Sequence, residues 1–146
     1  MTEIAFTVAP RIEADTSFVA DLPLSQLRLM NDARYPWLLL VPRRSGAEEW
    51  SDLSAEDALQ LSREIHLATR LLIRFSAPYK VNVASLGNVV RQMHVHVVGR
   101  NTNDPAWPGA VWGVGKSLPY SDKERQERTL QLQGLLASME LIPDSA

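Results

Sequence analysis

The chain has 146 residues and a formal net charge of −2, with 45% hydrophobic and 22% charged residues. These values are typical of a globular chain with one hydrophobic core, so we interpret residues 1–146 as a single domain. The charge balance excludes a nucleic-acid partner that is bound through bulk positive charge. The absence of cysteine excludes thiolate nucleophiles and cysteine zinc sites.

The N-terminal sequence contains Glu3 and lacks a basic segment followed by an apolar run, so no secretory signal is expected. No apolar stretch approaches the roughly 18 residues that a membrane-spanning helix requires. We therefore expect a cytoplasmic protein without a membrane partner.

The first half of the chain predicts three short strands. Strand-forming residues occupy positions 16–21, 24–30 and 37–41, separated by Leu22-Pro23 and by a turn-forming cluster at 31–36. Pro42 closes the third strand, which is apolar throughout and typical of a strand buried on both faces. Three consecutive strands with short connections favour an antiparallel meander.

A long helix follows. Ser54 is suited to cap its N-terminus, and apolar residues recur every three or four positions from Ala58 to Phe75 before Pro78 ends the pattern. Residues 79–86 and 92–98 alternate between polar and apolar, which predicts a hairpin across the turn at Gly87-Asn88. A second helix is expected over about residues 121–139, after an irregular segment that contains Trp107 and Trp112.

The candidate site lies within residues 89–100. In an extended strand Gln92, His94 and His96 project from one face, while Met93, Val95 and Val97 project from the other. Each of the two adjacent imidazoles has a donor and an acceptor, so burying them side by side costs free energy unless both groups are hydrogen-bonded. This face is therefore the candidate site.

Three interpretations of the two imidazoles are open. They can be ordinary satisfied histidines. They can share a metal ion, but the remaining histidine, His66, is expected at the edge of the core, and no carboxylate has diagnostic spacing. Finally, a neutral imidazole can attack a phosphate ester and form a covalent intermediate, with backbone amides of the Gly87-Asn88 turn helping to hold the anion.

Residues 92–98 resemble the signature of the histidine triad (HIT) family of nucleotide hydrolases and transferases, in which three histidines alternate with apolar residues. The likeness extends to residues 29–43, to Asn82 and to residues 104–113, and covers about residues 15–115. The resemblance implies an α+β fold, with an antiparallel sheet of about five strands and two helices, and a homodimer.

The resemblance also implies roles for individual residues. His94 matches the nucleophile that attacks the α-phosphorus of a nucleoside phosphoramidate or dinucleoside polyphosphate, and His96 matches the histidine that contacts phosphate oxygens. Asn31 or Asp32 falls where the family binds ribose, and Asn82 where an amide contacts the nucleophile and phosphate. Asn88 and Val89, beside the turn, complete the expected phosphate-binding set. The ligand is expected to be a purine nucleotide; no metal site or cofactor is required, although Mg²⁺ can accompany a polyphosphate.

Two positions depart from the family pattern. Gln92 stands where the first triad histidine belongs, and Trp37 stands where several branches have another active-site histidine. Neither side chain can act as an acid or a base. Two functions follow as alternatives: a hydrolase with slow or restricted turnover, in which Gln92 orients a ring or binds an oxygen, or a nucleotide-binding module with little turnover. At most two of Arg43, Arg44, Arg91 and Arg100 are expected to contact the ligand, and Trp107 and Trp112 are expected to stack on a base, cover an interface or pack on the sheet.

Overall fold

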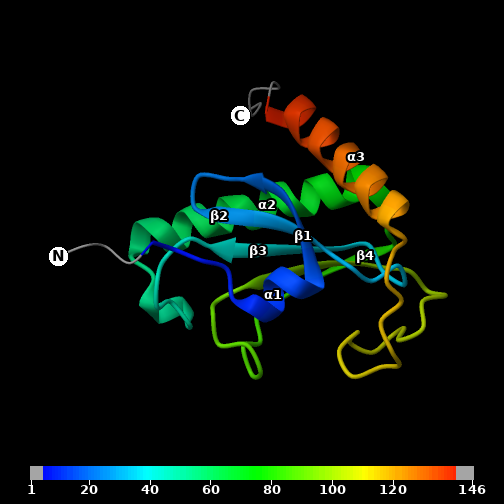
Figure 1. Ribbon diagram of the computed structural model, residues 1–146, viewed down its shortest axis with the longest axis horizontal. Helices are drawn as coiled ribbons and strands as arrows, with labels where there is room; N and C mark the ends of the chain where they lie inside the picture. Colours follow the sequence, from blue (N-terminus) through cyan, green and yellow to red (C-terminus); the bar gives the residue numbers. More distant parts are fainter. Residues whose placement is uncertain (1–4, 141–146) are drawn as a thin grey trace.

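The computed structural model describes residues 5–140 (Figure 1); the expectation about a signal sequence falls partly on residues 1–4, outside this range. Its elements are α1 (Pro10–Asp15), β1 (Thr16–Asp21), β2 (Ser25–Met30), β3 (Trp37–Pro42), a short 3₁₀ helix (Trp50–Asp52), α2 (Ala55–Ser76), β4 (Lys80–Ala84), β5 (Val95–Arg100) and α3 (Asp122–Glu140). Within the described residues, no helix is both long and apolar enough to cross a membrane.

The five strands form one antiparallel sheet in the order β1-β2-β3-β5-β4. The predicted meander is present as β1-β2-β3, and the predicted hairpin as β4-β5. The α+β fold expected from the sequence is therefore confirmed. Strand β5 inserts between β3 and β4, which places its residues near the middle of the sheet.

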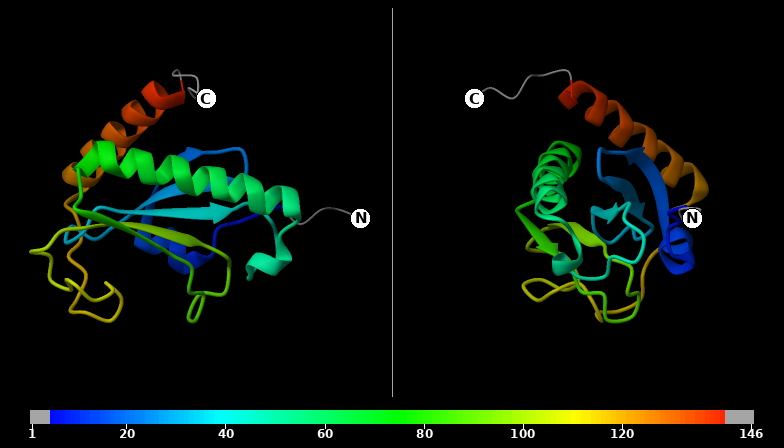
Figure 2. Two further views of the ribbon diagram at one scale, coloured as in Figure 1. Left: turned by 180° about the vertical axis from the view of Figure 1, so that it is seen from behind. Right: turned by 90° about the vertical axis from the view of Figure 1, so that its left-hand side faces the viewer.

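The two faces of the sheet have different neighbours. On one face, Leu38 and Leu40 of β3 and Val95 and Val97 of β5 belong to the core beneath α2 and α3. On the other face, residues of the same strands pack with Ile12 of α1 and with Val111. The helices α2 and α3 thus cover one side, and the segment after β5 runs over the other (Figure 2).

The long helix α2 follows its sequence signals. The Ser54 side chain accepts a hydrogen bond from the Asp57 amide, which caps the first turn. Ala77 ends the helix with a φ of 46°, and its amide donates to the Ile73 carbonyl. The C-terminal helix α3 buries Leu132, Leu136 and Met139 against the same core.

Two features differ from the sequence expectation. Helix α1 was not foreseen, because six residues are too few to show helical periodicity. Strand β5 begins at Val95, so Gln92 and His94 precede it. The strand is shorter because its last partner on β3 is Leu40, paired with Val95, and its last partner on β4 is Ala84, paired with His96.

Candidate functional site

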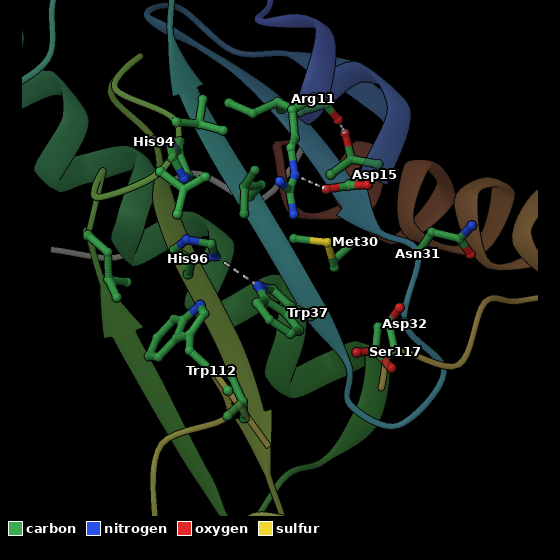
Figure 3. A pocket seen from close by; sticks show the side chains of 18 of the residues that line it. Arg11, Asp15, Met30, Asn31, Asp32, Trp37, His94, His96, Trp112 and Ser117 are labelled. Atoms are coloured by element: carbon green, nitrogen blue, oxygen red, sulfur yellow. Dashed lines mark hydrogen bonds and ion pairs between the residues drawn. The ribbon is translucent and has the colours of Figure 1, made fainter. Parts of the chain in front are cut away.

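A pocket of about 780 Å³ opens on the face of the sheet that α2 does not cover (Figure 3). One wall carries His94, His96 and Trp112, and the far side carries Asn31, Asp32 and Ser117. Residues of α1 and of the loop between β4 and β5 complete the wall. The pocket is therefore assembled from segments spread over most of the chain.

His94 lines the pocket, and one of its two ring nitrogens is hydrogen-bonded to the backbone. The side chain is buried, with 8% exposure, and its Nδ1 lies 2.7 Å from the Gln92 carbonyl oxygen. A carbonyl oxygen only accepts, so Nδ1 must carry the proton and donate it. In the neutral ring, Nε2 is then the unprotonated nitrogen, as a nucleophile requires.

His96 has the opposite tautomer. The indole Nε1–H of Trp37 donates to His96 Nδ1 over 3.0 Å, and because that donor cannot accept, the neutral His96 ring carries its proton on Nε2. Burial, together with the neighbouring His94, lowers the pKa of His96 to about 3. The ring centroids of the two histidines lie 5.0 Å apart. His96 is thus a neutral hydrogen-bond donor beside a potential nucleophile.

The two tryptophans in the segment after β5 have different environments. Trp112 lines the pocket, with its ring centroid 5.1 Å from that of His96 and 6.1 Å from that of Trp37. Its Nε1 atom is buried without a hydrogen-bond partner among the described residues. Trp107 instead contacts Tyr79 edge-on and lies beside the Arg100 guanidinium. Of these two tryptophans, only Trp112 lines the pocket.

Asn31 and Asp32 line the pocket opposite the histidines. The Asn31 side-chain oxygen accepts from the Tyr120 amide, which leaves its NH₂ group as a donor. The Asp32 carboxylate is held by Arg34 at 2.8 Å and by the Leu118 amide at 3.2 Å. Burial raises the pKa of Asp32, but the hydrogen bonds from Arg34 and Leu118 outweigh this effect and leave the pKa below its ordinary value.

The side chains of Gln92 and Asn82 lie outside the pocket wall. Gln92 hydrogen-bonds with its Oε1 to the Ala9 amide at 2.7 Å and with its Nε2 to the Thr7 carbonyl at 2.8 Å. Asn82, on β4, accepts from Arg100 at 2.8 Å. Gln92 nevertheless reaches the site through its backbone carbonyl, which holds His94.

Asn88 and Val89 lie on the loop between β4 and β5, which forms one rim of the pocket, as expected from the turn before the histidines. None of the four arginines suggested as ligand contacts lines the pocket. They are engaged elsewhere by carboxylates of Asp21, Asp57, Glu48 and Asp104. His66 is exposed on α2 rather than at the edge of the core. Among the described residues, no group of three or more His, Asp or Glu side chains is placed to hold a metal ion.

Sequence reasoning missed three charged residues of the pocket, Arg34 and, on α1, Asp15 and Arg11. The only signal for α1 was Pro10, which is favourable at the first position of a helix but too common to identify so short an element. The segment before Arg11 is also held by a single distant residue, Gln92, whose partners Ala9 and Thr7 lie 83 and 85 positions away in the chain.

Comparison with known proteins identifies the family. A model of the HIT domain matches residues 11–103. The chain belongs to the HIT family. A histidine triad protein from Bradyrhizobium japonicum is 42% identical, with a TM-score of 0.87 over 91% of this chain and 99% of that one. A histidine triad protein from Marinobacter aquaeolei is 37% identical, with a TM-score of 0.87 over 92% and 98%.

More distant structures share the HIT fold. The diadenosine triphosphate hydrolase of Plasmodium falciparum is 13% identical, with a TM-score of 0.66 over 94% of this chain and 88% of that one. Among proteins of curated function, none matches the chain.

Proposed function

We propose that this HIT protein is a nucleotide hydrolase in which His94 forms a covalent nucleotidyl intermediate. The observation that carries the proposal is the hydrogen bond from His94 Nδ1 to the Gln92 carbonyl, because it leaves Nε2 as the unprotonated nitrogen of a ring that lines the pocket. The family membership and the diadenosine triphosphate hydrolase that shares the fold support a nucleotide as the ligand.

The proposed reaction has two displacements at the α-phosphorus. In the first, His94 Nε2 forms a bond to phosphorus, and the bond from phosphorus to the leaving group breaks with its electron pair on the leaving atom. In the second, water attacks phosphorus, the bond to Nε2 breaks, a nucleoside monophosphate leaves and the proton of the water passes to solvent. The neutral His96 Nε2–H is placed to donate to a non-bridging oxygen as negative charge develops there.

The same geometry favours a leaving group that departs as an anion. His96 is unsuited to act as a general acid, because the protonated ring that could give up a proton is disfavoured. A proton on Nδ1 would face the N–H donor of the Trp37 indole. A phosphoramidate nitrogen has to gain a proton before it leaves, whereas a polyphosphate leaves as a stable anion. We therefore place dinucleoside polyphosphates ahead of phosphoramidates as substrates.

The test compares diadenosine tri- or tetraphosphate with adenosine phosphoramidate at neutral pH. We expect release of adenosine monophosphate from the polyphosphate, a transient mass increase on His94, and loss of at least a hundredfold in rate for His94→Ala. Full activity in His94→Ala would refute the covalent mechanism. Faster cleavage of the phosphoramidate would refute the preference among leaving groups.

The second candidate is a nucleotide-binding module with little turnover. It is favoured by the two positions at which this chain lacks a histidine of the family pattern. The Gln92 side chain hydrogen-bonds to the backbone of residues 7 and 9, and the Trp37 side chain hydrogen-bonds to His96. This function predicts that adenosine monophosphate binds while a stoichiometric amount of protein leaves the polyphosphate intact. Mass spectrometry of His94 after long incubation separates the two candidates, since the module forms no adduct.

A further inference from the structure

The segment before the sheet reaches the pocket as an ordered arm, residues 7–15. Gln92 holds the start of this arm by pairing its side-chain amide with the Thr7 carbonyl and the Ala9 amide. A carbonyl and an amide that flank one residue of an extended chain point to the same side, as in a parallel β-ladder. One primary amide can therefore satisfy both groups, as a neighbouring strand would.

The far part of the arm is α1, which is fixed by the apolar contacts of Ile12 with the core on the pocket side of the sheet. Thr16 continues this anchoring, because its hydroxyl donates to the Ile12 carbonyl over 2.6 Å. Arg11 lies between the two anchors formed by Gln92 and Ile12, and its side chain lines the pocket (Figure 3).

The charge of Arg11 is weakly engaged. In the described pocket wall the cationic side chains are Arg11 and Arg34. Arg34 makes several short hydrogen bonds to the buried Asp32 carboxylate. Arg11 makes one contact of 3.4 Å with Asp15, and both side chains are more than half exposed, at 69% and 54%. An exposed pair of this kind adds little stability, so an anionic ligand can take Arg11 from Asp15.

The histidines leave that role open. In the neutral form that a nucleophile requires, His94 carries no charge, and His96 accepts from Trp37 and presents a neutral N–H, so neither supplies a full positive charge to the ligand. We propose that Arg11 binds the second phosphate of a nucleotide whose first phosphate faces His94. The hydrogen bonds between Gln92 and the arm hold Arg11 in this position. This inference rests on a nucleotide as the ligand, as proposed above, and adds a residue that selects among nucleotides by phosphate number.

Calorimetry tests the inference with two ligands that the protein does not cleave, adenosine monophosphate and α,β-methylene adenosine diphosphate. We expect wild-type protein to bind the diphosphate about tenfold more tightly, the gain from a charged hydrogen-bonded contact. Arg11→Gln should reduce this ratio to about one. Asp15→Asn should raise it, because Arg11 then has no competing carboxylate.

Arg63→Gln is the matched control, since Arg63 is exposed on α2, which covers the opposite face of the sheet. It should leave the affinity ratio unchanged. Gln92→Ala keeps the backbone carbonyl that holds His94 and removes both contacts with the arm. In this variant we expect a lower ratio, and faster hydrogen exchange of the Ala9 amide.

The outcomes separate this inference from the proposed reaction. An unchanged ratio in Arg11→Gln, or an equal loss of affinity for both nucleotides, overturns the role of Arg11 whether or not the protein is an enzyme. An Arg11-dependent ratio together with no adduct on His94 upholds the inference and refutes the covalent reaction. If neither nucleotide binds the wild-type protein, both proposals fail.

Discussion

His96 is buried between three aromatic rings at the centre of the pocket wall. The Trp37 indole donates to its Nδ1, and the rings of Trp112 and His94 lie against it. Such surroundings favour the neutral ring, because a positive charge there would lose its hydration. The consequence for stability differs from that of an exposed histidine.

The free energy of unfolding should fall as pH decreases from about 6.5 towards about 3. Burial lowers the pKa of His96 from 6.5 to about 3 in the folded protein, so across this window the unfolded chain binds a proton that the folded chain does not. The slope from this residue approaches about 1.4 kcal/mol per pH unit. Urea unfolding at several pH values measures it.

The comparison with His96→Gln isolates this contribution from that of the carboxylates. His96→Gln should unfold with a shallower pH dependence, and His66→Gln, at an exposed position, should keep the wild-type slope. If the free energy of unfolding depends on pH in the same way in His96→Gln and in the wild type, then His96 is not buried as a neutral ring.

The three polar residues of the motif show what sequence spacing can and cannot determine. The alternation correctly separated Met93, Val95 and Val97, which enter the core, from the two histidines, which line the pocket. It could not show that Gln92 turns to the arm, because its partners are 83 and 85 positions away. Nor could it show that Trp37, 59 positions from His96, sets the tautomer.

At the scale of elements, the end of β5 is held by a buried ion pair. Arg100 and Asp104 are 2.8 Å apart, with side-chain exposures of 1% and 6%. Asp104 also accepts from the Ala106 and Trp107 amides. The hydrogen bonds from Arg100 hold the pKa of Asp104 below its ordinary value. The pair therefore fixes the start of the segment that later places Trp112 in the pocket.

Asp104→Asn should destabilise the protein by about 3 kcal/mol, because it leaves the Arg100 guanidinium buried without its counter-charge. Glu127→Gln removes one partner of the exposed Lys123–Glu127 pair and should cost less than about 0.5 kcal/mol. Urea denaturation of both variants measures the difference. Equal effects would mean that the buried pair makes no special contribution.

Close packing of β5 against two prolines gives a second prediction at this scale. A Cβ on Gly99 would lie 2.6 Å from Pro36 Cγ and 3.2 Å from Pro78 Cβ. Gly99→Ala should therefore lower the free energy of unfolding by about 1–3 kcal/mol. Gly134→Ala on α3, where a Cβ meets nothing within 4 Å, should instead raise it by about 0.5–1 kcal/mol. Thermal unfolding distinguishes the two, and destabilisation by both substitutions would contradict the steric explanation.

Sequence patterns predicted the strands and long helices well, because each contributes its own periodicity or cap. They predicted less well where an element ends for tertiary reasons, as β5 does when its last neighbours at Leu40 and Ala84 are reached. Helix α1 lay below the length at which periodicity is detectable. Its contribution to the pocket therefore became visible only in the folded chain.

At the scale of the whole molecule, the pocket joins α1, the four strands β1, β2, β3 and β5, the loop between β4 and β5, and the segment after β5. A nucleotide that contacts all of these parts should stabilise the folded chain as a unit. Adenosine monophosphate at a hundred times its Kd should add about 2.7 kcal/mol to the free energy of unfolding, measurable as a shift in Tm. Adenosine should give a smaller shift at equal concentration; an equal shift would show that the phosphate contributes nothing.

Alternate residues of β5 point to opposite faces of the sheet, so substitutions along this one strand have two different kinds of effect. Substitutions at Val95 and Val97 act on the core beneath α2, and so alter how much folded protein a cell retains. Substitutions around His96 act on the pocket, and so alter which ligand the retained protein prefers. Ligand preference in this chain can therefore drift over generations while Val95 and Val97 keep their packing beneath α2.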